Sequence, residues 1–94
     1  MIEFRDDDAG YFDSISANPG GFVLNLRRRI DPKYVVLHRA GCASISDQGR
    51  APGAYTARGY RKVCARDLAE LALAAKREGR RDGSFSKRCS RCVP

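Results

Sequence analysis

The feature that most constrains how this chain can fold is a histidine and three cysteines arranged as two short pairs. His38 and Cys42 form a His-x3-Cys pair where the apolar run 34–37 ends, and Cys89 and Cys92 form a Cys-x2-Cys pair near the last residue. Three thiolates and one imidazole are a complete ligand set for a closed tetrahedral zinc site. The spacing therefore predicts a small domain held together by one structural Zn²⁺.

A fourth cysteine, Cys64, leaves alternatives to this ligand set. An all-sulfur set with Cys64 in place of His38 is chemically just as good, and His38 would then be a hydrogen-bonded core residue. In a third interpretation there is no metal: Cys42 and Cys64 are small buried hydrophobes, and Cys89 and Cys92 form a surface dithiol. Because the two pairs are complete without Cys64, we expect this residue to be a buried structural thiol.

The length and the N-terminal sequence indicate one domain, residues 1–94, in a reducing compartment. A chain this short buries a smaller fraction of its surface than a larger one, so a metal staple is a reasonable expectation. The acidic opening, with Asp6, Asp7 and Asp8, has no basic start and no apolar stretch behind it, so we expect neither a signal peptide nor a membrane span. This favours the cytoplasm, where thiols stay reduced and cysteine pairs bind metal more often than they form disulfides.

The hydrophobic periodicity predicts an α+β fold. Helical spacing covers 6–17, strand-like alternation covers 22–27, and the apolar run continues to a second strand at 34–38, joined to the first by a hairpin-length connection. A weaker pattern indicates a third strand at 58–63, and the clearest helix spans 67–78. We therefore expect a small antiparallel sheet of two or three strands with N-terminal and C-terminal helices and a C-terminal zinc knuckle.

The net charge of +7 is unevenly distributed. Residues 1–26 hold one base and five acids, a balance of −4, whereas residues 27–94 hold 17 bases and six acids, a balance of +11. A body this basic attracts polyanions, of which nucleic acid is the commonest in the cytoplasm, although each base taken singly is more often a solvated charge. The candidate contacts to a phosphate backbone are Arg27, Arg28, Arg29, Arg39, Arg58, Arg61, Lys62, Lys87, Arg88 and Arg91.

The order of these motifs over residues 34–94 resembles the Ada-type zinc-binding domain, the metal domain of a bacterial DNA alkylation-response protein. That family runs Cys-x3-Cys, a helix, then Cys-x2-Cys followed closely by proline; here Leu-His-Arg-Ala-Gly-Cys, the helix and Arg-Cys-Ser-Arg-Cys-Val-Pro follow in the same order. The resemblance implies a zinc-stabilised α+β fold and an inclination toward the DNA backbone. His38 stands where the family has the thiolate that accepts a methyl group from a DNA phosphotriester. A neutral imidazole lacks that nucleophilicity, so methyl transfer is not expected.

Together these observations favour a binding module over an enzyme. A zinc with four protein ligands has no open position for water, and a lone histidine that serves as a ligand leaves no general base. The leading interpretation is a small zinc-stabilised module that contacts the phosphate backbone of nucleic acid. The alternative is a protein-interaction or adaptor domain whose acidic segment 6–13 and basic body recognise a partner or a second copy.

Overall fold

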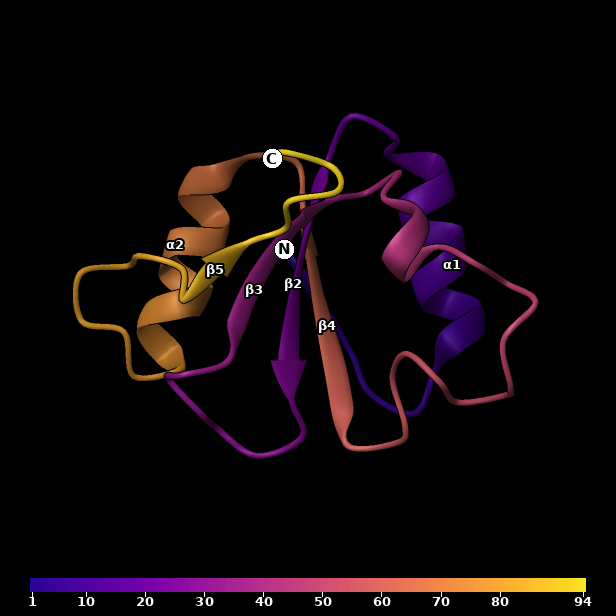
Figure 1. The fold of residues 1–94 in the computed structure, drawn as a ribbon, viewed down its shortest axis with the longest axis horizontal. Coiled ribbons are helices and arrows are strands. Elements are labelled where there is room, and N and C mark those ends of the chain that lie inside the picture. Colours follow the sequence, from indigo (N-terminus) through magenta and orange to yellow (C-terminus); the bar gives the residue numbers. More distant parts are fainter.

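The computed structural model describes all of residues 1–94 and has a mixed five-stranded sheet with helices on its two faces (Figure 1). The strand order is β1-β4-β2-β3-β5, and every pairing is antiparallel except that of β3 with β5. The elements in chain order are β1 (Ile2–Phe4), α1 (Asp8–Ala17), β2 (Phe22–Arg27), β3 (Val35–Arg39), the 3₁₀ turn η1 (Ala43–Ile45), β4 (Tyr60–Ala65), α2 (Leu68–Arg77) and β5 (Lys87–Arg88).

The predicted fold, a small antiparallel sheet of two or three strands with N-terminal and C-terminal helices and a C-terminal zinc knuckle, is wrong. The sheet has two further strands, β1 and β5, of three and two residues, which are too short for an alternating pattern to be detected. Strand β5 follows α2 and pairs in parallel with β3, with Val36 opposite Lys87, so the helix is not the last element and the sheet is mixed. Both short strands exist because tertiary packing brings them to a sheet edge.

Helix α1 begins two residues later than the charge pattern predicted. Asp6 has φ of 51°, which no helix continues through, and Asp7 then caps the helix by accepting a hydrogen bond from the Gly10 N–H at 2.9 Å. Asp8, in the first turn, lies where the helix dipole favours a negative charge. The acidic run therefore sets the start of α1.

Helix α2 lies within one residue of the predicted 67–78 at each end. Asp67 accepts a hydrogen bond from the Glu70 N–H at 2.9 Å, and Gly79, with φ of 93°, ends the helix in the left-handed conformation. Leu71 and Ala75 on its inner face are fully buried against the sheet. Their apolar spacing explains why this helix was the easiest element to predict.

Two separate cores lie on the two faces of the sheet. Alternate residues of β2 point to opposite faces, so Leu24 and Leu26 pack under α2 while Val23 packs toward α1. The core on the α1 side contains Tyr11, Ile15, Val23, Ala40, Cys42, Ile45, Tyr55, Cys64 and Cys89. Two of the predicted metal ligands therefore belong to the core on the α1 side.

Candidate metal centre

The structure brings the two predicted ligand pairs together at one end of β3. The ligand atoms of His38, Cys42, Cys89 and Cys92 all lie within 4.8 Å of one another, and no metal ion is part of the structure. His38 is the last residue but one of strand β3, and Cys42 directly precedes η1. Cys89 directly follows β5, and its N–H donates to the Leu37 carbonyl at 2.9 Å. The parallel β3–β5 pairing is thus what carries the C-terminal pair to the histidine.

The sulfur positions fit a metal better than a disulfide. The Sγ atoms of Cys42 and Cys89 are 3.9 Å apart. Two sulfurs bound to one tetrahedral Zn²⁺ at ~2.3 Å are separated by about 3.8 Å, whereas a disulfide bond measures about 2.05 Å. All four cysteines are free, so the cluster has the donor set and the spacing of a zinc site.

His38 supplies the clearest sign that a partner belongs in this cluster. Its Nδ1 is the buried side-chain nitrogen or oxygen in the protein that has no hydrogen-bond partner, and the residue is 6% exposed. Burial, helped by the positive charges of Lys62 and Lys87, lowers the pKa of His38 to about 4. The imidazole is therefore neutral at pH 7, which is the form that binds a metal, and a metal ion would satisfy the unpaired nitrogen.

The Cys-x2-Cys segment forms a tight knuckle whose backbone supports negative charge on sulfur. The Val93 N–H donates to the Cys89 carbonyl at 3.1 Å and closes the turn, and the Arg39 N–H points at the Cys92 sulfur at 3.3 Å. Burial raises the pKa of Cys92 to about 11, while for Cys89 backbone hydrogen bonds from Cys92 and Arg91 outweigh burial and lower the pKa. The backbone hydrogen bonds of the knuckle therefore favour a thiolate in the Cys89–Cys92 pair.

Three arginines that were candidate phosphate contacts instead hold the knuckle in place. Arg39 donates to the carbonyls of Cys92 at 3.1 Å and Val93 at 3.0 Å, and Arg88 donates to the Pro94 carbonyl at 3.1 Å. Arg91 donates to the Ser44 hydroxyl at 3.4 Å and so links the knuckle to η1. A site of three thiolates and one neutral imidazole would leave Zn²⁺ with a net charge of −1, which these guanidinium groups would partly offset.

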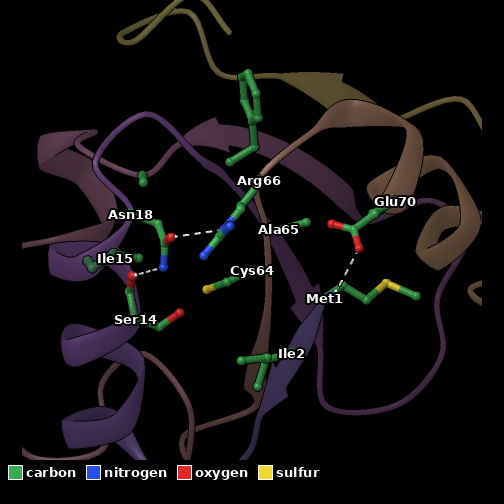
Figure 2. A pocket seen from close by; sticks show the side chains of 11 residues that line it. Met1, Ile2, Ser14, Ile15, Asn18, Cys64, Ala65, Arg66 and Glu70 are labelled. Atoms are coloured by element: carbon green, nitrogen blue, oxygen red, sulfur yellow. Dashed lines mark hydrogen bonds and ion pairs between the residues drawn. The ribbon is translucent and has the colours of Figure 1, made fainter.

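Cys64, the alternative ligand, lies elsewhere. Val23 of β2 pairs with His38 on one side and with Cys64 on the other, so two strand spacings, about 9.6 Å, separate the two residues. Cys64 lines a cavity of about 360 Å³ between α1 and the end of β4, and Figure 2 shows its side chain on the same side as Ser14 of α1. Burial raises the pKa of this thiol to about 11, so Cys64 is a protonated core residue outside the cluster.

Two of the predicted phosphate contacts are buried and cannot reach a nucleic acid. Arg61 is 2% exposed and ion-paired with Glu78 and Glu3, because it faces the end of α2. Lys62 is also 2% exposed, and its Nζ donates to the Tyr55 carbonyl at 2.6 Å and to the Asn25 side chain at 2.9 Å. Charge alone could not distinguish these residues from the exposed bases.

The five remaining predicted contacts differ in whether a carboxylate neutralises their charge. Arg28 is ion-paired with Asp6, with Nη2 2.6 Å from the carboxylate. Arg27, Arg29, Arg58 and Lys87 are exposed and form no ion pair. Among the predicted phosphate contacts, these four are exposed, free of ion pairs and not engaged in holding the knuckle.

Sequence reasoning overlooked Tyr34 as a surface residue. Its ring lies 6.0 Å from that of Tyr60 between centroids, and the guanidinium of Arg27 lies 4.2 Å above it. Tyr60 is opposite Arg27 in the β2–β4 register, and Tyr34 enters β3 beside them after the turn at 28–33. Leu26 pairs with Val35 in the β2–β3 hairpin. Extending this register by one residue would have placed Tyr34 opposite Arg27.

Comparisons with protein-family models, with curated proteins and with solved structures found no match for this chain. The similarity to the Ada-type domain therefore stays a prediction from the motif order. Neither helix is long and apolar enough to cross a membrane.

Proposed function

We propose that this protein is a zinc-stabilised binding module that contacts nucleic-acid phosphates through its exposed arginines. The observation that carries the metal part is the His38, Cys42, Cys89 and Cys92 cluster, with ligand atoms within 4.8 Å and an unpaired buried imidazole nitrogen. With four protein ligands the metal has no open position for a reacting water, so its role is structural. We propose no catalytic or methyl-accepting role.

The phosphate-binding part rests on the exposed bases that no carboxylate neutralises. Of the predicted contacts, Arg27, Arg29, Arg58 and Lys87 remain after three sets are excluded: the buried bases, the ion-paired Arg28 and the three arginines that hold the knuckle. Guanidinium and ammonium groups bind phosphate oxygens regardless of base sequence. We therefore propose backbone contact without sequence readout.

The adaptor alternative depends on the acidic segment 6–13 and the basic body, and three of the four aspartates of that segment have partners within the protein. Within the acidic segment, Asp6 is paired with Arg28, Asp7 caps α1, and the Asp8 carboxylate accepts hydrogen bonds from Thr56. These carboxylates are used to fold the protein. We therefore do not propose a partner that recognises them.

Native mass spectrometry of protein purified without added metal tests the metal proposal. We expect a mass increment of one zinc ion, retained in Cys64→Ser and lost in Cys89→Ser, because only Cys89 belongs to the cluster. A protein that is folded and free of metal would contradict the proposal. Zinc loss in Cys64→Ser alone would make Cys64 the ligand in place of His38.

A salt series tests the phosphate contacts. If about four phosphates are neutralised, log K for duplex DNA will fall with log salt at a slope of about −4, nearly independent of sequence. Replacing Arg27 and Arg29 by Ala should shallow the slope by about 2, because each lost contact removes about one released counterion. Fluorescence anisotropy with random-sequence probes measures this.

The matched control is Arg28→Ala, which removes a neighbouring arginine whose charge Asp6 already neutralises. Arg28→Ala should change the slope of log K against log salt by less than Arg27→Ala or Arg29→Ala does. Failure to bind duplex, single-stranded DNA or RNA at low salt would contradict the nucleic-acid proposal and leave the metal proposal intact.

A further inference from the structure

One part of the sheet face on the α1 side combines aromatic rings with an exposed cation. Tyr34 and Tyr60 are half-exposed, with ring centroids 6.0 Å apart and planes inclined at 47°. Arg27 lies 4.2 Å from the Tyr34 centroid and 5.4 Å from the Tyr60 centroid, and its Nη1 is 3.3 Å from the Tyr60 hydroxyl. The three residues come from three neighbouring strand regions and form a platform at the end of the sheet.

The four strands β2 to β5, which surround this platform, carry no carboxylate. They contain seven basic or imidazole side chains. On the platform's own face, Asn25 donates to the Tyr34 hydroxyl at 3.2 Å, and Lys87 projects from β5 beside Val36. The exposed Arg27 and Lys87 thus flank a polar and aromatic strip that crosses β2, β3 and β5.

Helix α1 does not extend over this strip. It packs on the side of the face formed by β1 and β4, where Tyr11 stacks with Phe4, Phe12 and Tyr55. Asn25, Tyr34 and Val36 remain half-buried and Arg27 remains exposed. The platform is therefore open to a flat ligand from solvent.

We propose that this platform, consisting of Arg27, Tyr34 and Tyr60, binds single-stranded nucleic acid by stacking on unpaired bases while Arg27 and Lys87 contact the phosphates. The proposal rests on the proposed function and specifies its substrate. Bases stack on tyrosine rings and on guanidinium planes. The platform offers both, since the Arg27 guanidinium lies 4.2 Å from the Tyr34 ring centroid. A duplex keeps its base faces covered, so only an unpaired strand can use the rings.

The intrinsic fluorescence of the protein gives a test that needs no substitution. The chain has four tyrosines and no tryptophan, and of the four only Tyr34 and Tyr60 are more than marginally exposed. Adding a twelve-nucleotide oligothymidylate to the zinc-loaded protein should quench the tyrosine emission, whereas a duplex of the same length should quench it little. Binding of the oligothymidylate, seen by anisotropy, without quenching would overturn the proposal.

Substitutions then assign the effect to the rings. Tyr34→Ala and Tyr60→Ala should each weaken oligothymidylate binding by roughly 5- to 100-fold, the range expected for the loss of one stacked base, and leave duplex binding within about twofold. Tyr34→Phe keeps the ring and should bind like the unsubstituted protein. Arg77→Ala is the charge control for Arg27→Ala. It also removes one exposed base, but from α2 on the other face of the sheet.

The outcomes separate this proposal from the one it rests on. Equal affinity for single strand and duplex, unchanged in both tyrosine-to-alanine variants, would overturn stacking and leave phosphate contact standing. No binding to either probe would overturn both.

Discussion

Removal of the metal, by a strong chelator or by Cys89→Ser, is expected to unfold the α1 side of the protein and lower the melting temperature by about 20 °C or more. The apparent free energy of structural zinc binding is roughly 10–16 kcal/mol in zinc-finger peptides, which is comparable to the whole stability of an ordinary small domain. Even ~5 kcal/mol corresponds to a shift of about 20–40 °C for a chain of this size. Circular dichroism melts with and without chelator measure the loss.

The location of the ligands explains why the effect should be this large. Cys42 and Cys89 are part of the core on the α1 side, and without the metal the knuckle is attached to the rest of the protein only by the two residues of β5 and the hydrogen bonds from its arginines. Without metal, the thiols of Cys42 and Cys89 and the unpaired imidazole nitrogen of His38 would remain buried with few compensating contacts. Unfolding would expose these groups to water and so remove the free-energy cost of burying them without partners.

Cys64→Ser is the matched control for a cysteine in the same core. It replaces a buried thiol, 8% exposed and outside the cluster, by a hydroxyl of similar size, so we expect a loss of about 1 kcal/mol and full zinc occupancy. Similar melting temperatures for the Cys64→Ser and Cys89→Ser variants would contradict a structural metal at the cluster.

The parts of the fold that sequence predicted are those fixed by local patterns. Helix α2 combines a cap, Asp67, with apolar residues at helical spacing and a terminating Gly79, and all three signals act within a dozen residues. The His-x3-Cys and Cys-x2-Cys pairs are local as well, because each pair is held by one turn. Such features can be recognised in a sequence without knowing which segments pack against them.

What sequence missed depends on contacts between distant segments. Strands β1 and β5 exist only because they lie against β4 and β3, and their own few residues carry no period. The burial of Arg61 and Lys62 also depends on contacts with segments that are distant in the sequence. They are adjacent in β4 and point to opposite faces of a strand that is covered on both faces. The strand position, and not the residue type, therefore decides their exposure.

Arg61 also gives the second large expected effect: Glu78→Gln should lower the free energy of unfolding by about 3 kcal/mol. The Arg61 and Glu78 side chains are 2% and 7% exposed, and two hydrogen bonds join them, one of 2.9 Å between Nη1 and Oε2. Removing one partner of a buried ion pair typically costs roughly 3–5 kcal/mol, because the remaining charge stays buried without compensation. Glu3, 3.1 Å from Arg61, would offset part of that cost, which places the expectation at the lower end.

A double-mutant cycle separates the burial of the charge from the loss of the pair. Arg61→Met combined with Glu78→Gln should recover much of the stability lost in Glu78→Gln alone, since no uncompensated guanidinium remains. Glu3→Ala, which removes a 42% exposed partner of the same arginine, should cost less than about 1 kcal/mol in urea unfolding. If Glu78→Gln were no more destabilising than Glu3→Ala, the pair would not be buried as described, and Arg61 would return to the set of bases available to phosphate.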